Sequence, residues 1–309
     1  MVRKALLIGI NYTGTNHALR GCHQDVRNMI EFLEYHGFHQ DDMVVLMDQE
    51  GTDPHGSSWP TGQNIQRAIQ WLIHTPNASL FMHYSGHGGN IPDPDGTGTN
   101  ATICPVDFEQ HGQIDSDTLH QTLVTPLPPS SQIHAIFDCC HSGSVLELSH
   151  VYRLDESGHV LLLDNIKTGL RLASSAAGLL QGGFTREKVR DAQELLGGAK
   201  SFFSSFSRLG SGNADGLDEE ANSDYPEEAR QAILYSGCRD DQTSADASIA
   251  GAATGAMSWA FLKVMREFDG QQSYVDILRN TRELLVQNYS QVPQLSCAGE
   301  IDLDSSFQL

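Results

Sequence analysis

Two apolar stretches that each break into small and polar residues constrain the fold of this chain most. The first, residues 80–84, continues as Ser-Gly-His-Gly and so delivers His87 directly after it. The second, residues 133–137, continues as Asp-Cys-Cys-His-Ser-Gly. Short apolar runs bounded by turn-forming residues are typical of buried strands. Ligands of an open α/β sheet bind at the carboxyl edge of its strands, so we expect both polar segments at one cleft.

An imidazole and a thiol at one sheet edge are the two groups that a cysteine hydrolase needs. The imidazole accepts the thiol proton, and the thiolate attacks a carbonyl carbon. His87 precedes Cys140 by 53 residues (140 − 87 = 53), which fits the caspase pattern of a histidine about 50 residues before its cysteine. Position alone leaves Cys139 as a competing nucleophile.

Hydrophobic periodicity predicts alternating strands and helices. In the first half we expect strands at 3–12, 43–47, 79–84 and 101–106, and helices around 26–33, 65–72 and 115–124. Further on we expect a hairpin within 151–163, strands at 232–235 and 293–297, and helices at 256–268 and 273–289. Thr61 can cap the second helix, and the Gly-, Pro- and Asp-rich residues 88–101 are expected to form a loop. The order strand-helix-strand-helix-strand predicts a parallel sheet with helices on both faces.

Taken together, the motifs resemble those of one protease family. Tyr84-Ser-Gly-His-Gly88 occurs with Asp138-Cys-Cys-His-Ser-Gly143, and matching segments lie at 19–25, 105–108, 236–246 and 254–259. Each catalytic motif is weak alone, but their joint occurrence is specific. The set is similar to that of the metacaspases, caspase-fold proteases of fungi, plants and protists. The resemblance covers most of the chain outside residues 150–228.

The resemblance implies a caspase-like three-layer αβα sandwich around a central, mainly parallel β-sheet. Residues 1–150 would form a large-subunit-like half, 151–228 a linker, and 229–309 a small-subunit-like half, in a monomer. The first strand begins almost at the first residue, so the Pro-rich prodomain of many family members is expected to be absent or removed.

The resemblance also assigns the catalytic roles. The family's nucleophile directly precedes His-Ser-Gly, which selects Cys140 and leaves Cys139 as a packing residue. His87 would act as the base of a Cys-His dyad, with no third member evident. The backbone N–H groups of Gly88 and Cys140 are the expected oxyanion donors, because a glycine lets the backbone approach the substrate closely.

An acidic primary pocket for Arg or Lys is implied by the same resemblance. The family's pocket positions fall on Asp25 and Asp138, together with Cys22 and Ser85. Without the family, Asp25 reads as a solvated helix carboxylate and Asp138 as the cap of a nearby backbone amide. The expected substrates are proteins with Arg or Lys before the scissile bond. An Asp-specific caspase would need a basic pocket, which these two aspartates argue against.

Calcium is where the chain departs from the family pattern. By spacing, the family's calcium-binding positions fall on Asn100, Ser116, Asp117 and Glu147, and Asp115 could substitute for Ser116. Two of these four positions are not carboxylates. Calcium takes 6–8 oxygen ligands, and its affinity follows their charge. We therefore expect a calcium site that is weaker than the family norm or lost, and no organic cofactor.

Self-processing is expected in the linker, which is rich in Gly, Ser and Ala between residues 164 and 228. A protease that selects basic residues can cut where a flexible backbone enters its cleft. The candidate sites are Arg186, Lys188, Arg190, Lys200 and Arg208.

Composition excludes several other classes of protein. The formal net charge of −20, from 39 acidic and 19 basic residues, argues against nucleic acid and anionic membranes as partners. No apolar run approaches the ~20 residues that span a bilayer. Six cysteines, two of them adjacent, do not form a disulfide framework, so we expect a reducing cytoplasmic or nuclear location.

The alternative function is a caspase-fold scaffold in protein interaction or aggregate handling, with proteolysis incidental. An intact Cys140 and His87 disfavour a purely non-catalytic version of this scaffold.

Overall fold

The computed structural model describes residues 1–93, 98–139, 142–154, 160–164, 230–237, 246–249, 252–268, 271–288 and 291–309. The chain divides into two compact units, one formed by Met1–Asp164 with Glu227–Leu309 and the other by Asn165–Pro226. All described residues belong to the first unit, and the fold given below is that of this unit. The candidate nucleophile Cys140 and the five candidate self-cleavage residues lie outside the described residues.

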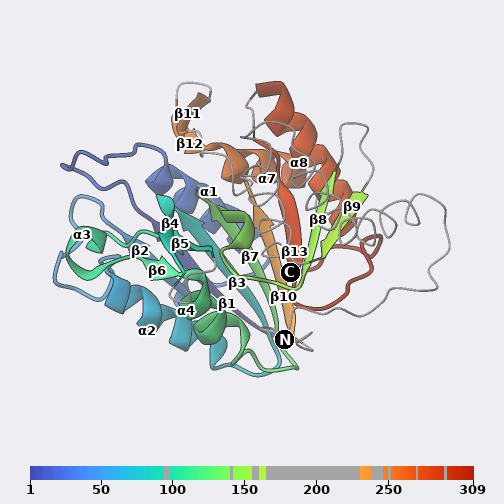
Figure 1. Ribbon diagram of the computed structural model, residues 1–309, viewed down its shortest axis with the longest axis horizontal. Coiled ribbons are helices and arrows are strands. Elements are labelled where there is room, and N and C mark those ends of the chain that lie inside the picture. The colour runs from blue at the N-terminus through green and yellow to red at the C-terminus, as the bar shows by residue number, and fades with distance from the viewer. Residues whose placement is uncertain are drawn as a thin grey trace, which may run out of the picture. The chain divides into compact units, whose positions relative to one another are not determined.

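The main sheet has eight strands among the described residues, in the order β2-β1-β3-β7-β10-β13-β8-β9 (Figure 1). The strands are β1 (Val2–Gly9), β2 (Met43–Met47), β3 (Ala78–Ser85), β7 (Gln132–Asp138), β8 (His150–Leu154), β9 (Val160–Asp164), β10 (Gln231–Ser236) and β13 (Gln294–Cys297). The first five strands in this order are mutually parallel, and the last three extend the sheet antiparallel. The predicted caspase-like sandwich with a mainly parallel sheet is confirmed.

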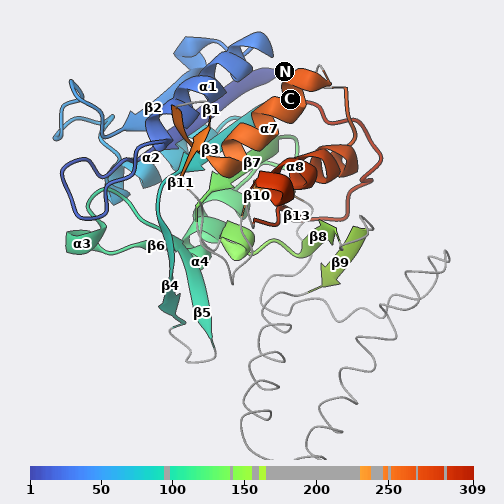
Figure 2. The same cartoon turned by 90° about the horizontal axis from the view of Figure 1, so that it is seen from above.

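Helices cover both faces of this sheet because its central strands are apolar on both faces. The main helices are α1 (Cys22–Tyr35), α2 (Gly62–Ile73), α7 (Ala256–Glu267) and α8 (Tyr274–Asn288). In β1, Leu6 and Ile8 pack in the core with α2, whereas Ala5 and Leu7 pack in the core with α1, α7 and α8. Alternate residues of a strand face opposite sides, so one strand feeds two cores. Figure 2 shows α1, α7 and α8 together along one side of the sheet.

Most of the predicted elements are observed at or near their predicted positions. The strand at 43–47 matches β2, and Thr61 caps α2 by accepting a hydrogen bond from the Asn64 N–H at 3.2 Å. The helix predicted at 115–124 is instead a short helix, α4 (Ser116–Leu119), followed by a π turn at His120–Val124. None of the helices in the described ranges is long and apolar enough to cross a membrane.

The loop predicted at 88–101 is wrong over most of its length. Strands β4 (Gly88–Pro92) and β5 (Thr99–Ile103) pair antiparallel, and β6 (Ile114–Asp115) adds a third strand. Glycine-rich composition suggested a loop, but here a glycine permits close packing. A Cβ at Gly89 would lie 2.9 Å from Gln113 Oε1, so a larger residue would require the Gln113 side chain to shift.

The second half of the chain completes the sheet begun by the first half. Strand β10 pairs in parallel with β7, although more than 90 residues separate them in the sequence. The hairpin predicted within 151–163 is observed as β8 and β9 at the far edge of the sheet. The predicted linker, 151–228, therefore begins with strands of the main sheet, and its residues 165–228 lie outside the described part of the chain.

Candidate active site

The two polar segments singled out in the sequence follow neighbouring strands that end in register. Strand β3 pairs in parallel with β7, and Ser85 lies opposite Asp138 at their carboxyl ends. His87 follows Ser85 by two positions in the sequence, as Cys140 follows Asp138. The shared sheet edge expected for these segments is therefore observed for the described residues.

The His87 side chain is fixed by a backbone carbonyl. Its Nε2 lies 2.7 Å from the His17 carbonyl oxygen. A carbonyl can only accept a hydrogen bond, so Nε2 donates, and in the neutral ring Nδ1 carries the lone pair. The His17 ring is held in turn by Glu109 Oε1 at 3.1 Å and by an edge contact with Phe108. This orienting group could not be predicted from the sequence, because every residue has a backbone carbonyl.

The structure brings Asp25, Ser85 and Asp138 together under the start of α7. Asp25 is fully buried, and Asp138 is 4% exposed. The Ser85 hydroxyl donates to Asp25 Oδ2 at 2.7 Å. The Gly255 N–H donates to both Asp25 oxygens at 2.9 and 3.0 Å, and a Cβ at Gly255 would lie 2.2 Å from Asp138 Oδ2. Gly255 therefore lies between the two carboxylates.

Without the family resemblance, Asp138 is interpreted as a cap of a backbone amide and Asp25 as a solvated helix carboxylate; the structure supports the first interpretation and contradicts the second. Asp138 does accept the Ser258 N–H at 2.7 Å, so it serves as a cap for the first turn of α7. Asp25 is no solvated helix carboxylate, because its burial is complete. Cys22, the fourth predicted pocket residue, is buried at the start of α1, where its N–H donates to Asn11 Oδ1 at 3.0 Å.

Buried polar contacts fix the start of α7 against the sheet. Burial lowers the pKa of His83, in β3, to about 3, so its ring is neutral at physiological pH. Its Nε2 lies 2.9 Å from the Ser258 hydroxyl. Ser258, whose N–H donates to Asp138, is thus held from the sheet side as well. Neither Gly255 nor Ser258 was predicted as a site residue, although both lie within or beside the segment at 254–259 that matches the family.

Comparisons with known proteins show the family to which this chain belongs. A family model described as metacaspase, peptidase C14 domain, matches residues 3–149. A metacaspase-1 of Mycosarcoma maydis is 44% identical over 99% of this chain and 72% of its own length. A metacaspase-1 of Scheffersomyces stipitis is 42% identical over 99% of this chain and 73% of its own length. The chain belongs to the metacaspase family. It is therefore a cysteine protease, and its substrates are proteins.

A solved structure supports the fold independently. A protein of Geobacter sulfurreducens superposes with a TM-score of 0.56 over 99% of this chain and 97% of its own. The two sequences are only 20% identical. This likeness shows the shared fold alone.

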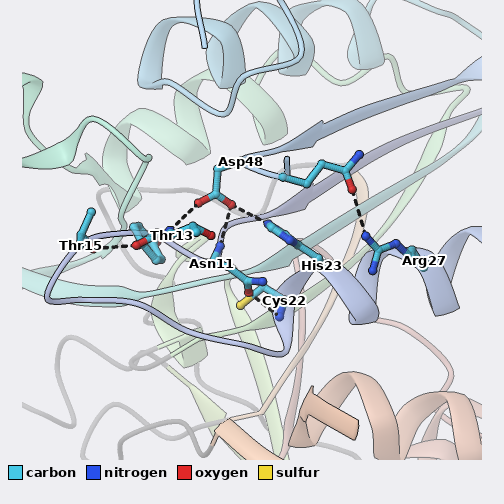
Figure 3. Close-up of polar contacts among 9 residues, drawn as sticks. Asn11, Thr13, Thr15, Cys22, His23, Arg27 and Asp48 are labelled. Atoms are coloured by element: carbon cyan, nitrogen blue, oxygen red, sulfur yellow. Dashed lines mark hydrogen bonds and ion pairs between the residues drawn. The ribbon is translucent and has the colours of Figure 1, made fainter. Parts of the chain in front are cut away.

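A buried carboxylate, Asp48, holds the loop of the metacaspase chain that supplies the His17 carbonyl (Figure 3). Its oxygens accept the N–H groups of Asn11 at 2.8 Å and Thr13 at 3.2 Å, and His23 Nε2 lies 2.7 Å away. Burial alone would raise the pKa of Asp48, but the hydrogen bonds from His23 and from these two amides together outweigh it and lower the pKa. Asp48 therefore ties the end of β1 to the first turn of α1.

Replacing Asp48 with asparagine is expected to reduce the free energy of unfolding by about 2–3 kcal/mol, as for lost hydrogen bonds to a charged group. The folded-state pKa is lowered, so the contribution is fully present above the unfolded value of about 3.9 and is lost as the pH falls through the folded value. The stability difference from the native chain should thus be steady near neutral pH and narrow below about pH 4. Urea unfolding across this pH range measures it.

Asp53→Asn is the matched control for this measurement. Asp53 is exposed and accepts one backbone N–H, from His55 at 2.9 Å. The Asp53→Asn substitution should reduce the free energy of unfolding far less than Asp48→Asn, because surface substitutions usually have small effects. Equal losses in the two variants would contradict a special role for Asp48.

The residues proposed from the sequence for calcium form hydrogen-bonded pairs instead of a cage. Asn100 Nδ2 donates to Asp117 Oδ2 at 2.9 Å, and the Ser116 hydroxyl donates to Glu147 Oε1 at 2.6 Å. Asp115 caps α4 by accepting the Thr118 N–H at 2.8 Å. Among the described residues no three His, Cys, Asp or Glu side chains converge as a metal site. Two buried oxygens of this set, Asn100 Oδ1 and Glu147 Oε2, accept no hydrogen bond from the described residues, and two oxygens are far short of the 6–8 that calcium takes. The set does not fit a calcium cage.

Proposed function

We propose that this metacaspase cleaves peptide bonds after Arg or Lys, with Cys140 as nucleophile and His87 as its base. The observation that carries the proposal is the convergence of two buried carboxylates, Asp25 and Asp138, on the backbone of Gly255 at the sheet edge where His87 emerges. Buried charges are costly unless they are paired. Two of them side by side favour a cationic side chain as their partner.

The proposed proton transfers follow from the orientation of His87. With Nε2 donating to the His17 carbonyl, Nδ1 is the nitrogen that accepts the Cys140 thiol proton. The thiolate then forms a bond to the carbonyl carbon of the substrate, and the C–N bond breaks as the imidazolium returns the proton to the leaving amine. Water, deprotonated by the same nitrogen, hydrolyses the thioester and restores the thiol.

Strand pairing supports Gly88 as one oxyanion donor. In an antiparallel ladder, hydrogen-bonded and non-bonded residue pairs alternate. The Cys104 N–H bonds to the His87 carbonyl at 3.1 Å. The next pair, Gly88 with Ile103, is then of the non-bonded kind, and the Gly88 N–H is directed away from β5. It is thus available to a substrate oxyanion, beside the Cys140 N–H proposed from the sequence.

The proposed primary pocket would bind a substrate cation with two buried carboxylates. Asp25 accepts hydrogen bonds from Gly255 and Ser85, and Asp138 accepts a hydrogen bond from Ser258. Arginine can bind such a pair bidentately, whereas lysine presents one compact charge. We infer that arginine substrates are at least as good as lysine substrates.

A peptide panel tests the proposal directly. Peptides that end in Arg, Lys or Asp before a fluorogenic leaving group should be cleaved in the first two cases and left intact in the third. Cleavage after Asp by the native chain would overturn the assignment of the pocket.

Self-processing is part of the proposal. The candidate bonds follow basic residues between 186 and 208, in the Gly-, Ser- and Ala-rich part of the sequence. We further propose a monomeric enzyme of the cytoplasm or nucleus. No disulfide joins the four described cysteines, Cys22, Cys104, Cys139 and Cys297, which is in keeping with a reducing compartment.

Calcium is expected to stimulate this enzyme only at high micromolar concentrations or above, or not at all, because neutral Asn100 and Ser116 stand where carboxylates would be needed. Introducing Asn100→Asp together with Ser116→Asp should strengthen binding and make the thermal unfolding midpoint rise with added calcium. Titration calorimetry and thermal unfolding measure both effects.

Thr99→Asp is the control for the added charge. Thr99 is exposed and precedes buried Asn100 on β5, so its side chain points to the opposite face of the strand. This variant should gain no calcium response. Submicromolar binding of calcium to the native chain would contradict the ligand argument.

A further inference from the structure

Two buried tyrosines enclose the backbone of His87. Tyr12 follows β1, and Tyr84 is the penultimate residue of β3. Both are fully buried or nearly so, at 1% and 0% exposure. Their hydroxyl groups lie 3.3 Å apart, directly below the segment that carries the catalytic imidazole.

Each hydroxyl bonds to one backbone group of His87 and one of Cys104. Tyr12 Oη accepts the His87 N–H at 3.0 Å and donates to the Cys104 carbonyl at 2.6 Å. Tyr84 Oη donates to the His87 carbonyl at 2.7 Å and accepts the Cys104 N–H at 3.2 Å. A phenol has one proton, so each hydroxyl donates one of these four hydrogen bonds and accepts another. The two tyrosines together satisfy the N–H and the C=O of His87.

This arrangement lies where the β4–β5 hairpin meets the main sheet. Gly88 and Ile103 are the first residues of the hairpin to pair, and His87 and Cys104 are the next residues outward. A Cβ on Gly86 would lie 2.8 Å from Tyr84 Oη and 3.1 Å from Tyr12 Oη. Glycine at this position therefore lets both hydroxyls reach the backbone of His87.

The backbone of Tyr12 shows that the contact is enforced by its surroundings. Its φ of +48° is in the left-handed region, which non-glycine residues seldom adopt and which persists only where surrounding contacts determine it. The Tyr12 ring also packs on the His87 imidazole, with centroids 4.7 Å apart. Burial raises the pKa of Tyr12 and of Tyr84 well above 10, so both phenols keep the proton that they donate.

We propose that Tyr12 and Tyr84 are positioning residues for catalysis. Their hydroxyls fix the backbone of His87, and Tyr12 fixes its ring, so that Nε2 donates to the His17 carbonyl and Nδ1 keeps its lone pair for the proton of the Cys140 thiol. The proposal rests on the proposed function in one respect, namely that His87 is the base for Cys140. It adds two side chains that act only through His87.

Tyr12→Phe and Tyr84→Phe test the proposal, because each removes one hydroxyl and keeps the ring. Each change should lower kcat by about tenfold to a hundredfold, as expected for a misplaced catalytic group, and change KM little. Each should also shift the pH dependence of Cys140 alkylation by iodoacetamide, followed for that peptide by mass spectrometry. A loss of packing or stability alone would not move this pH profile.

Tyr235→Phe is the matched control. Tyr235 is equally buried, its hydroxyl donates to the Tyr274 carbonyl at 3.2 Å, and it lies in β10 away from His87. Its loss should lower the thermal unfolding midpoint and leave the pH profile of alkylation as in the native chain.

The same substitutions in a His87→Ala background distinguish the positioning role of the two tyrosines from the role of His87 as the base. If the tyrosines act through His87, neither change should alter the alkylation of Cys140 further once the imidazole is absent. The proposal is overturned if folded Tyr12→Phe and Tyr84→Phe chains keep the native pH profile, or if their effect persists without His87. If His87→Ala itself leaves the alkylation rate and its pH profile unchanged, the assignment of His87 as the base fails instead. Either tyrosine variant suffices for the test if the other does not fold.

Discussion

Cys140→Ala is expected to abolish peptide cleavage, whereas Cys139→Ala should keep substantial activity. Removing the nucleophile of a catalytic unit commonly costs several orders of magnitude in kcat. Cys139 is fully buried within the core that packs against α2, so its thiol has a packing role, as predicted from the sequence. His87→Ala should be nearly as damaging as Cys140→Ala, because residues that act as one unit give losses that do not add. Cleavage of an Arg peptide, measured as kcat/KM, gives the result.

Self-processing supplies a second measurement on the same variants. Intact-mass spectra of the incubated native chain should show fragments that end at one or more of Arg186, Lys188, Arg190, Lys200 and Arg208. The Cys140→Ala chain should remain whole. An active Cys140→Ala chain beside an inactive Cys139→Ala chain would show that the nucleophile is misassigned. A native chain that cleaves peptides and yet stays whole would remove self-processing and leave catalysis untouched.

Asp138→Asn is expected to lower kcat/KM for Arg peptides by roughly two to four orders of magnitude. Removing one partner of a buried charge pair typically costs about 3–5 kcal/mol, and each 1.36 kcal/mol is tenfold in rate. Asparagine can still accept the Ser258 N–H that Asp138 accepts, because asparagine and aspartate are comparable helix caps. The variant should therefore fold with α7 in place and lack only the charge.

Asp25→Asn should have an effect of similar size, because the Asp25 carboxylate is fully buried. Neither variant should gain cleavage after Asp, since removing a negative charge does not install a cation. Alkylation of Cys140 by a small uncharged reagent should survive in both, because such a reagent does not need the pocket.

Asp276→Asn controls for the loss of one charge near a helix. Asp276 lies in the first turn of α8 with its side chain 47% exposed, and it pairs with Arg279. It should leave kcat/KM within about twofold, as expected for a surface substitution. Full activity of both Asp25→Asn and Asp138→Asn on Arg peptides would disprove the acidic pocket.

Local pattern was sufficient for the elements that carry the site. Short apolar runs located β3 and β7, and the motif that continues each run located His87 and Asp138, because side-chain type and spacing can be read directly from the sequence. The same composition rules failed at β4 and β5. There, Gly88 and Gly89 pair in a hairpin whose partner strand begins ten residues further on. The composition of a segment does not indicate which other segment will pair with it.

The sequence by itself determined the family motifs, the order of strands and helices, and the two aspartates that could select a basic side chain. Only the tertiary structure decided how these parts are held. The His17 carbonyl orients His87, the Gly255 and Ser258 N–H groups bind the two aspartates, and β10 pairs beside β7 across a long separation in the chain. The physical reason is the same in each case. Almost every residue has a backbone N–H and a C=O group, so the hydrogen-bond partners of these groups cannot be inferred from residue type. The partners are determined only when distant segments of the chain pack together.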